Sequence, residues 1–351
     1  MCDVSQHWAT ATIRSSTGGM TPEYHQRLTG ADFWHNPGVR MVIDTDPGID
    51  DAVALLYLAA QPGVEIAAVG TVHGNVEATA GARNALQILD VAGLADVPVA
   101  IGAARPLAQP PTFAEFIHGA DGLGGHGVEL ADGRGTVEES AAEQLVRLAR
   151  RHPGELTVLA IGPLTNLALA LLLEPRLPAL LRSVVVMGGS VNAPGNITGQ
   201  AEANTAHDPE AADLVYGAGL NLTLVGLDVT ETARADAAWL DRLAAATTPR
   251  ARFASRLLNH YATVYEGLFS EHIVTLHDAL AAAIAVDPTL ATYGEHVVDV
   301  ELRGTHTRGR TVVDLRPYRL AGQDQTRPPV RVATAVDAPA FLDRMAAALL
   351  D

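Results

Sequence analysis

Short runs of β-branched residues alternate with longer Ala- and Leu-rich segments through most of the 351-residue chain. The β-branched runs predict strands at 40–44, 65–71, 97–101, 156–161, 184–187 and 221–227. The segments between them predict helices at 51–60, 79–92, 140–151, 164–173 and 209–216. Strands joined through helices of this length lie parallel, with right-handed crossovers. The alternation therefore predicts an α/β fold with a mostly parallel, doubly wound central sheet flanked by helices.

The last third of the chain has a more helical pattern. It predicts helices at 237–246, 249–269, 278–286 and 338–350, with short strands at 297–302, 311–314 and 330–333. Because no internal repeat or low-complexity linker divides this pattern, we expect a single domain over residues 38–351. Residues 1–37 are polar and show no sustained period, which predicts a flexible N-terminal extension.

Composition narrows the possible partners. A hydrophobic fraction of 48% indicates a globular chain with a large core, and a formal net charge of −16 argues against nucleic acid or an anionic membrane. No run approaches the ~18 apolar residues of a membrane helix, and the N-terminus does not resemble a signal peptide. The single cysteine, Cys2, excludes an internal disulfide and fits a reducing compartment, so we expect a cytoplasmic protein.

Four aspartates lie within eight residues at and just after the end of the first predicted strand, at positions 44, 46, 50 and 51. Apolar residues resume at once, so these carboxylates lie next to buried positions rather than in a solvated tail. Like charges held so close together are costly unless a cation neutralises them. Carboxylates are hard oxygen ligands, which favours Ca²⁺ or Mg²⁺. The alternative, helix capping worth ~1 kcal/mol, accounts for one or two of the four.

Two further groups of polar residues follow predicted strands. His277-Asp278 opens a very apolar helix and offers a distant carboxylate and a proton donor, although an aspartate there can also be a simple cap. Segments 195–198, 202–204 and 208–209 carry amides and carboxyls suited to a polyhydroxylated ligand, although such residues also occur in ordinary turns. In α/β sheets ligands bind at the carboxyl ends of the strands, so we expect these groups to converge.

The run Asp-Thr-Asp-Pro-Gly-Ile-Asp-Asp-Ala at 44–52 resembles the N-terminal signature of the nucleoside hydrolases, the inosine–uridine preferring type. The resemblance extends over residues 39–345 through blocks at 72–75, 118–119, 162–166, 187–189, 195–196, 202–204, 208–209 and 277–278. It implies Ca²⁺-dependent hydrolysis of the N-glycosidic bond of ribonucleosides, giving ribose and free base, with a role in purine and pyrimidine salvage. It also implies a homo-oligomer, dimer or tetramer.

Carried over by position, the resemblance implies a metal site and two catalytic groups. The side chains of Asp46, Asp51 and Asp278 and the backbone carbonyl of Ile161 would bind Ca²⁺. Asp46 would also be the general base for the attacking water, and His277 would protonate the leaving base. This fits the chemistry, since breaking the bond leaves positive charge on the sugar and negative charge on the base.

The resemblance also implies a set of substrate contacts. These are Asp50, Asn75, His118, Met187, Asn196, Glu202, Asn204, Tyr261 and Tyr265. Ala203 stands where family members often have Phe, which removes an apolar wall near the 5′ side of the sugar. Tyr261 and Tyr265 lie on one helix face and predict a preference for both inosine and uridine; alternatively, both are core residues.

Two other functions are compatible with parts of the pattern. A Mg²⁺-dependent phosphohydrolase could use an aspartate after its first strand, but the Pro47-Gly48 bend and the absence of any lysine argue against it. A ribose- or nucleoside-binding protein without turnover would also need the polar loops. The presence of Asp46 together with His277 argues against that second possibility.

Overall fold

The structure is a computed structural model that describes residues 38–130, 133–316 and 327–350. The predicted N-terminal extension, 1–37, lies outside the described residues. From Gly38 onward the chain forms one compact unit.

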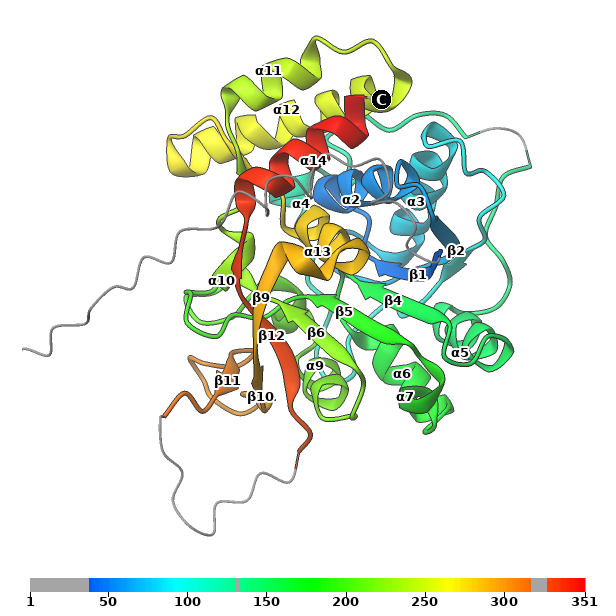
Figure 1. Cartoon of the computed structure of the whole chain (residues 1–351), viewed down its shortest axis with the longest axis vertical. Helices are drawn as coiled ribbons and strands as arrows, with labels where there is room; N and C mark the ends of the chain where they lie inside the picture. The colour runs from blue at the N-terminus through cyan, green and yellow to red at the C-terminus, as the bar shows by residue number, and fades with distance from the viewer. Residues whose placement is uncertain (1–37, 131–132, 317–326, 351) are drawn as a thin grey trace, which may run out of the picture. The chain divides into compact units, whose positions relative to one another are not determined.

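An eight-stranded sheet lies at the centre of this unit, in the order β3-β2-β1-β4-β5-β6-β12-β9 (Figure 1). Its strands are β1 (Val39–Thr45), β2 (Val64–Thr71), β3 (Val99–Ile101), β4 (Leu156–Ala160), β5 (Ser183–Met187), β6 (Leu222–Val225), β12 (Val330–Val336) and β9 (Ala291–His296). All neighbouring strands are parallel except β9, which pairs antiparallel with β12. The predicted fold class, α/β with a mostly parallel sheet, is confirmed.

Helices cover both faces of the sheet and form two apolar cores (Figure 1). One face carries α2 (Ile49–Ala59), α3 (Ala78–Val91), α11 (Ala237–Ala244), α12 (Pro249–Phe269), α13 (His277–Val286) and α14 (Ala338–Leu350). The other carries α5 (Ala141–Arg151), α6 (Thr165–Leu173) and α9 (Pro209–Tyr216). Because both faces are covered, β1 is buried almost throughout and reads in sequence as a continuous apolar run.

The strand order explains why distant parts of the sequence meet. β1 lies between β2 and β4, so the loops that follow these three strands leave the sheet side by side. Helix α13 packs against α2 and against β4 and β5, which brings its first residues to the same edge. The carboxyl edge of the sheet is therefore where the polar segments noted in the sequence converge.

Several short elements were not evident in the sequence. They are α4 (Glu115–His118), α7 (Leu177–Leu180), α8 (Ala203–His207), α10 (Leu227–Thr230), a 3₁₀ turn (Pro288–Leu290), the antiparallel pair β7 (Arg234–Ala235) with β8 (Val274–Thr275), and the edge strand β9. The strands predicted at 297–302 and 311–314 are present as β10 (Val298–Val300) and β11 (Thr311–Val313), which pair antiparallel. The strand predicted to reach residue 227 stops at Val225, because Gly226 is the N-cap of α10. Within the described ranges, no helix is long and apolar enough to cross a membrane.

Candidate active site and metal centre

The loop from β1 to α2 carries the first group of site residues. Its Gly48 is the N-cap of α2 and donates its N–H to Asp51 Oδ2 at 2.9 Å. The hydroxyl of Thr45 donates to the other oxygen, Asp51 Oδ1, at 2.5 Å. Asp51 is thus both a helix-capping residue and a buried carboxylate of the site, so the capping interpretation accounts for part of its role.

Asp46 is fully buried, and its carboxylate is closely surrounded by backbone. Its Oδ2 accepts the N–H of Asn75 at 2.7 Å, while its Oδ1 has no hydrogen-bond partner among the described residues. A Cβ at Gly74 would lie 2.0 Å from Oδ2, and one at Gly162 would lie 2.7 Å from Oδ1. These two positions must therefore be glycine for Asp46 to take its place between the β2 and β4 loops.

Three carboxylates from two helix N-termini meet in the interior. Oxygens of Asp50, Asp51 and Asp278 lie within 4.8 Å of one another, and all three residues are buried. Asp50 and Asp51 belong to the first turn of α2 and Asp278 to the first turn of α13. Among the described residues, no ion pair joins these aspartates or Asp46 to a basic side chain.

Burial raises the pKa of each of these carboxyls, because it removes the water that stabilises the charged form. The neighbouring negative charges add to this for Asp46, Asp50 and Asp278, and the pKa of Asp50 reaches about 8. A divalent cation would offset these charges directly. Hard oxygen donors, a shared centre and the unpartnered Asp46 Oδ1 fit such an ion.

The predicted backbone ligand, the carbonyl of Ile161, accepts a hydrogen bond from Asn204 Nδ2 at 3.0 Å. The same amide nitrogen lies 3.2 Å from the carbonyl of Met187. Asn204 therefore ties the ends of β4 and β5 together from α8. A carbonyl oxygen has two lone pairs, so this hydrogen bond leaves Ile161 able to bind a cation as well.

Glu202 is the N-cap of α8 and is almost fully engaged by backbone. Its carboxylate accepts the N–H groups of Asn204 at 2.8 Å, Thr205 at 2.9 Å and Gly189 at 2.8 Å. The side-chain oxygen of Asn196 accepts the N–H of Ala203 at 2.9 Å. Both predicted sugar contacts thus hold α8 against the loop after β5.

His277 and His118 are the two histidines predicted to face the base. His277 Nδ1 is 2.8 Å from the hydroxyl of Thr230, and burial lowers the pKa of His277. His118 Nδ1 accepts the N–H of Ile49 at 3.2 Å, and burial lowers the pKa of His118 to about 3. His118 is consequently a neutral imidazole that fixes the start of α2.

A row of aromatic rings continues from His118 along one face of α12. The His118 and Tyr261 centroids are 5.6 Å apart, those of Tyr261 and Tyr265 are 4.8 Å apart, and those of Tyr265 and Phe269 are 5.2 Å apart. Tyr261 is 3% exposed, whereas Phe269 is 60% exposed. Tyr261 is a core residue, and Tyr265 is half-buried and packs against that core.

The structure also reveals site contacts that the sequence reasoning missed. Thr45 binds Asp51 from within the acidic loop, so its position in that loop was a usable signal. Thr230 meets His277 across 47 positions of sequence. Nothing local marks Thr230, because a lone threonine after a strand has no distinctive pattern.

Comparisons with known proteins show that this chain is similar to nucleoside hydrolases. The family model described as inosine-uridine preferring nucleoside hydrolase matches residues 41–343. A probable uridine nucleosidase 2 of Arabidopsis thaliana is 38% identical over 307 residues, covering 86% of this chain and 95% of the relative. An inosine-uridine preferring nucleoside hydrolase of Leishmania major is 39% identical over 285 residues, covering 79% and 88%. The solved structure of a plant nucleoside hydrolase, PpNRh1, superposes with a TM-score of 0.83 at 32% identity, covering 90% and 99%.

Proposed function

This chain belongs to the inosine-uridine preferring nucleoside hydrolase family and is a ribonucleoside hydrolase, and we propose that it depends on Ca²⁺ held by Asp46, Asp51, Asp278 and the carbonyl of Ile161. Two observations support this proposal: oxygens of Asp50, Asp51 and Asp278 lie within 4.8 Å of one another, and the buried Asp46 Oδ1 has no hydrogen-bond partner among the described residues. Asp46 itself is not part of the group of three, so its place in the metal site rests on its unpartnered oxygen and on the family resemblance. A donor set of several carboxylates and a backbone carbonyl is typical of Ca²⁺, whereas Mg²⁺ favours fewer protein ligands and more water.

Bound Ca²⁺ would supply a Lewis acid that polarises oxygen atoms of the sugar and of water. Asp46 is the general base in this proposal, because its Oδ1 is buried and unpartnered among the described residues, and so is available to accept a proton. The remaining carboxylates, Asp50 in particular, stabilise the positive charge that develops on the ribose as the bond to the base breaks.

His277 is the proposed proton donor to the departing base. Burial favours its neutral form, so the substrate complex must raise its pKa for this role. Negative charge developing on the base would do so, because an opposite charge stabilises the imidazolium. Thr230 orients the ring through Nδ1 and leaves Nε2 as the atom that would deliver the proton.

The proposed substrate range includes both inosine and uridine. Tyr261 and Tyr265 offer aromatic surface of the kind that either base can contact, and their hydroxyls lie 3.4 Å apart. Asn75, Met187, Asn196, Glu202 and Asn204 would surround the sugar. Near-zero turnover of either nucleoside would remove this part of the proposal.

The direct test measures reducing-sugar release from inosine and from uridine, with protein that has been treated with a chelator and then given back Ca²⁺ or Mg²⁺. We expect release to stop on chelation and to return with Ca²⁺. Unchanged release in the chelator would contradict the metal requirement. Phosphate release from nucleotides, measured in parallel, would instead support a Mg²⁺-dependent phosphohydrolase.

The stereochemistry of the product tests the attacking water. Direct attack from the face opposite the base inverts the anomeric centre, so the first sugar formed should be α-ribose. NMR of the reaction at early times distinguishes the two anomers, and initial β-ribose would overturn this mechanism. Assembly as a dimer or tetramer and a cytoplasmic salvage role remain predictions, which sizing in solution and localisation of the native protein would test.

A further inference from the structure

Two adjacent polar residues at the start of α6, Thr165 and Asn166, are buried outside the proposed catalytic set, with 1% and 2% exposure. They follow the Gly162-Pro163 bend after β4, on the sheet face opposite α2 and α13. Between them they form five side-chain hydrogen bonds to the ends of β1, β2, β3 and the start of α9. The inference below rests on the proposed metal site.

The side-chain amide of Asn166 extends the sheet beyond its last backbone pair. Its Nδ2 donates to the carbonyl of Thr71 at 3.0 Å, and its Oδ1 accepts the N–H of Ala103 at 2.8 Å. It thereby bridges β2 and β3 just past their final pair. A Cβ at Gly102 would lie 2.2 Å from this Oδ1, so only glycine leaves room for the amide.

Asn166 also holds the end of β1. Its Nδ2 donates to Asp44 Oδ1 at 2.7 Å. The second oxygen of Asp44, Oδ2, has no hydrogen-bond partner in the described part of the chain. Asp44 is only two residues before Asp46. A shift of Asp44 would therefore be transmitted directly to Asp46, because the backbone between them is short and buried.

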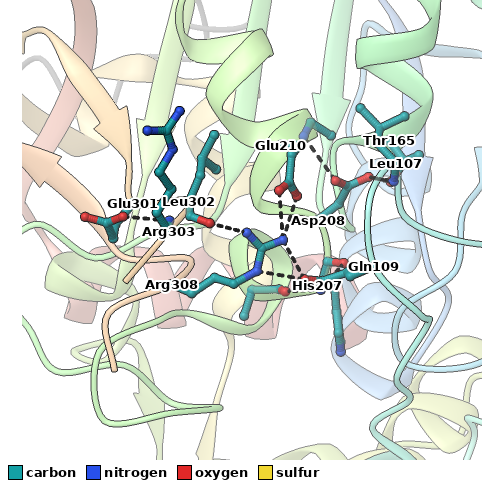
Figure 2. A network of polar contacts seen from close by, with 12 residues as sticks. Leu107, Gln109, Thr165, His207, Asp208, Glu210, Glu301, Leu302, Arg303 and Arg308 are labelled. Atoms are coloured by element: carbon teal, nitrogen blue, oxygen red, sulfur yellow. Dashed lines mark hydrogen bonds and ion pairs between the residues drawn. The ribbon is translucent and has the colours of Figure 1, made fainter. Parts of the chain in front are cut away.

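The hydroxyl of Thr165 links Asp208 to His73 in the loop after β2, and the donor and the acceptor in each of the two hydrogen bonds can be assigned. Its hydroxyl donates to Asp208 Oδ2 at 2.7 Å, so it must accept from His73 Nε2 at 3.0 Å. Asp208 is itself fixed by the N–H groups of Leu107 at 2.9 Å and Ala211 at 3.1 Å. Figure 2 shows Thr165 and Leu107 both directed at the Asp208 carboxylate.

His73, at the end of this series of hydrogen bonds, lies two residues before Asn75, which contacts two of the proposed metal-binding carboxylates. After His73 and Gly74 comes Asn75, whose N–H binds Asp46 Oδ2 and whose Nδ2 binds Asp51 Oδ2 at 3.0 Å. Thr165 thus fixes the segment that orients Asp46 and Asp51, while Asn166 fixes the end of β1, directly before Asp46. We propose that Thr165 and Asn166 are positioning residues that set the geometry of the metal carboxylates from the opposite face of the sheet.

The test measures Ca²⁺ affinity by calorimetry on metal-stripped full-length protein, with kcat and KM measured alongside at saturating Ca²⁺. Thr165→Val keeps the shape of the side chain and removes the hydroxyl, so we expect Ca²⁺ binding about 10–100-fold weaker, the usual cost of losing an outer partner of a metal ligand. Thr165→Ser keeps the hydroxyl and should bind Ca²⁺ within about threefold of wild type. Asn166→Leu should weaken binding at least as much as Thr165→Val.

Thr157→Val is the matched control. Thr157 is buried near the start of β4 and its hydroxyl lies 3.0 Å from that of Ser183, so this variant also loses a buried hydroxyl contact, but far from the carboxyl edge. It should bind Ca²⁺ as wild type does. If Asn166→Leu does not fold, the Val and Ser variants of Thr165 still decide the question.

The outcomes separate the two proposals. If wild type binds Ca²⁺ and Thr165→Val binds it equally well, the positioning role is wrong and the metal site stands. If Thr165→Ser is as weak as Thr165→Val, the hydroxyl is not the cause and the positioning role is again wrong. If wild type takes up no Ca²⁺, the metal site is wrong and the positioning inference is overturned with it.

Discussion

The charged residues at the two ends of β1 differ in their solvent exposure and in whether they form ion pairs. At its start, Arg40 pairs with Glu65 and Glu155 at 2.9 Å, and both glutamates are 58% exposed. At and just beyond its end lie Asp44, Asp46 and the carboxylates of α2, buried and without a basic partner among the described residues. Charges at the first edge are solvated and paired, whereas those at the second are neither.

The charges at the start of β1 contribute slightly to stability, whereas those at its end reduce stability and suit the binding of a ligand. Exposed ion pairs contribute little to folding, about 0–1 kcal/mol, because water already solvates both partners. Buried, uncompensated carboxylates oppose folding until a cation joins them. Of the two ends of β1, the one that carries this cost is the end where a ligand can offset it.

The largest expected effect comes from removing one carboxylate at the acidic edge. Asp278→Asn should lower kcat/KM by at least about 10³-fold, because it removes a proposed metal ligand. It should also stabilise the metal-free protein by about 1–2 kcal/mol, because it relieves like-charge repulsion. Activity assays and urea unfolding in chelator measure both changes. A variant that loses activity and stability together would contradict the contrast between the two edges.

His277→Ala tests the proton donor at the same edge. It should lower kcat on inosine by about 10²–10⁴-fold, the usual contribution of a general acid. A p-nitrophenyl riboside, whose leaving group needs no protonation, should be hydrolysed almost as fast by the variant as by wild type. Equal losses on both substrates would indicate that His277 orients the substrate instead.

His207, the last residue of α8, tests how burial at this edge couples to pH. Burial lowers its pKa to about 4, below the ordinary value of about 6.5. As pH is lowered, the unfolded chain therefore binds a proton at His207 at a higher pH than the folded protein does. The free energy of unfolding that depends on neutral His207 is fully present above pH 6.5 and is lost as pH falls towards 4.

In His207→Leu this contribution disappears. The slope of unfolding free energy against pH should fall by up to about 1.4 kcal/mol per pH unit between pH 6.5 and 4, relative to wild type. Urea unfolding of both proteins at several pH values gives the two slopes. Subtracting one slope from the other cancels the effect of all titrating groups that the two proteins share. Identical slopes would show that His207 titrates normally in the folded protein.

The smallest effect is expected at the opposite edge. Arg40→Ala removes the ion pairs to Glu65 and Glu155, and should lower the free energy of unfolding by no more than about 1 kcal/mol. Its kcat/KM should stay within about twofold of wild type, since the two edges are separated by the length of β1. A large loss of activity would show that the two edges are coupled.

The fold could be predicted from sequence to the extent that its signals are local. Helices α9, α12 and α14 begin and end where the pattern predicted them, at 209–216, 249–269 and 338–350. Edge strand β9 was missed because Gly294 and Glu295 interrupt its apolar character, and an edge strand needs only one neighbour. Five-residue α8 was missed because it is too short to show a period.

By itself, the sequence determined that several aspartates share one loop after a buried strand, because eight consecutive residues cannot move far apart. Only the tertiary structure decided which distant groups complete the site. Asn166 meets Asp44 across 122 positions, and Asp278 reaches Asp50 and Asp51 from another helix. The physical reason is strand order: β1 lies between β2 and β4, so the neighbours of its last residues depend on how the whole sheet assembles.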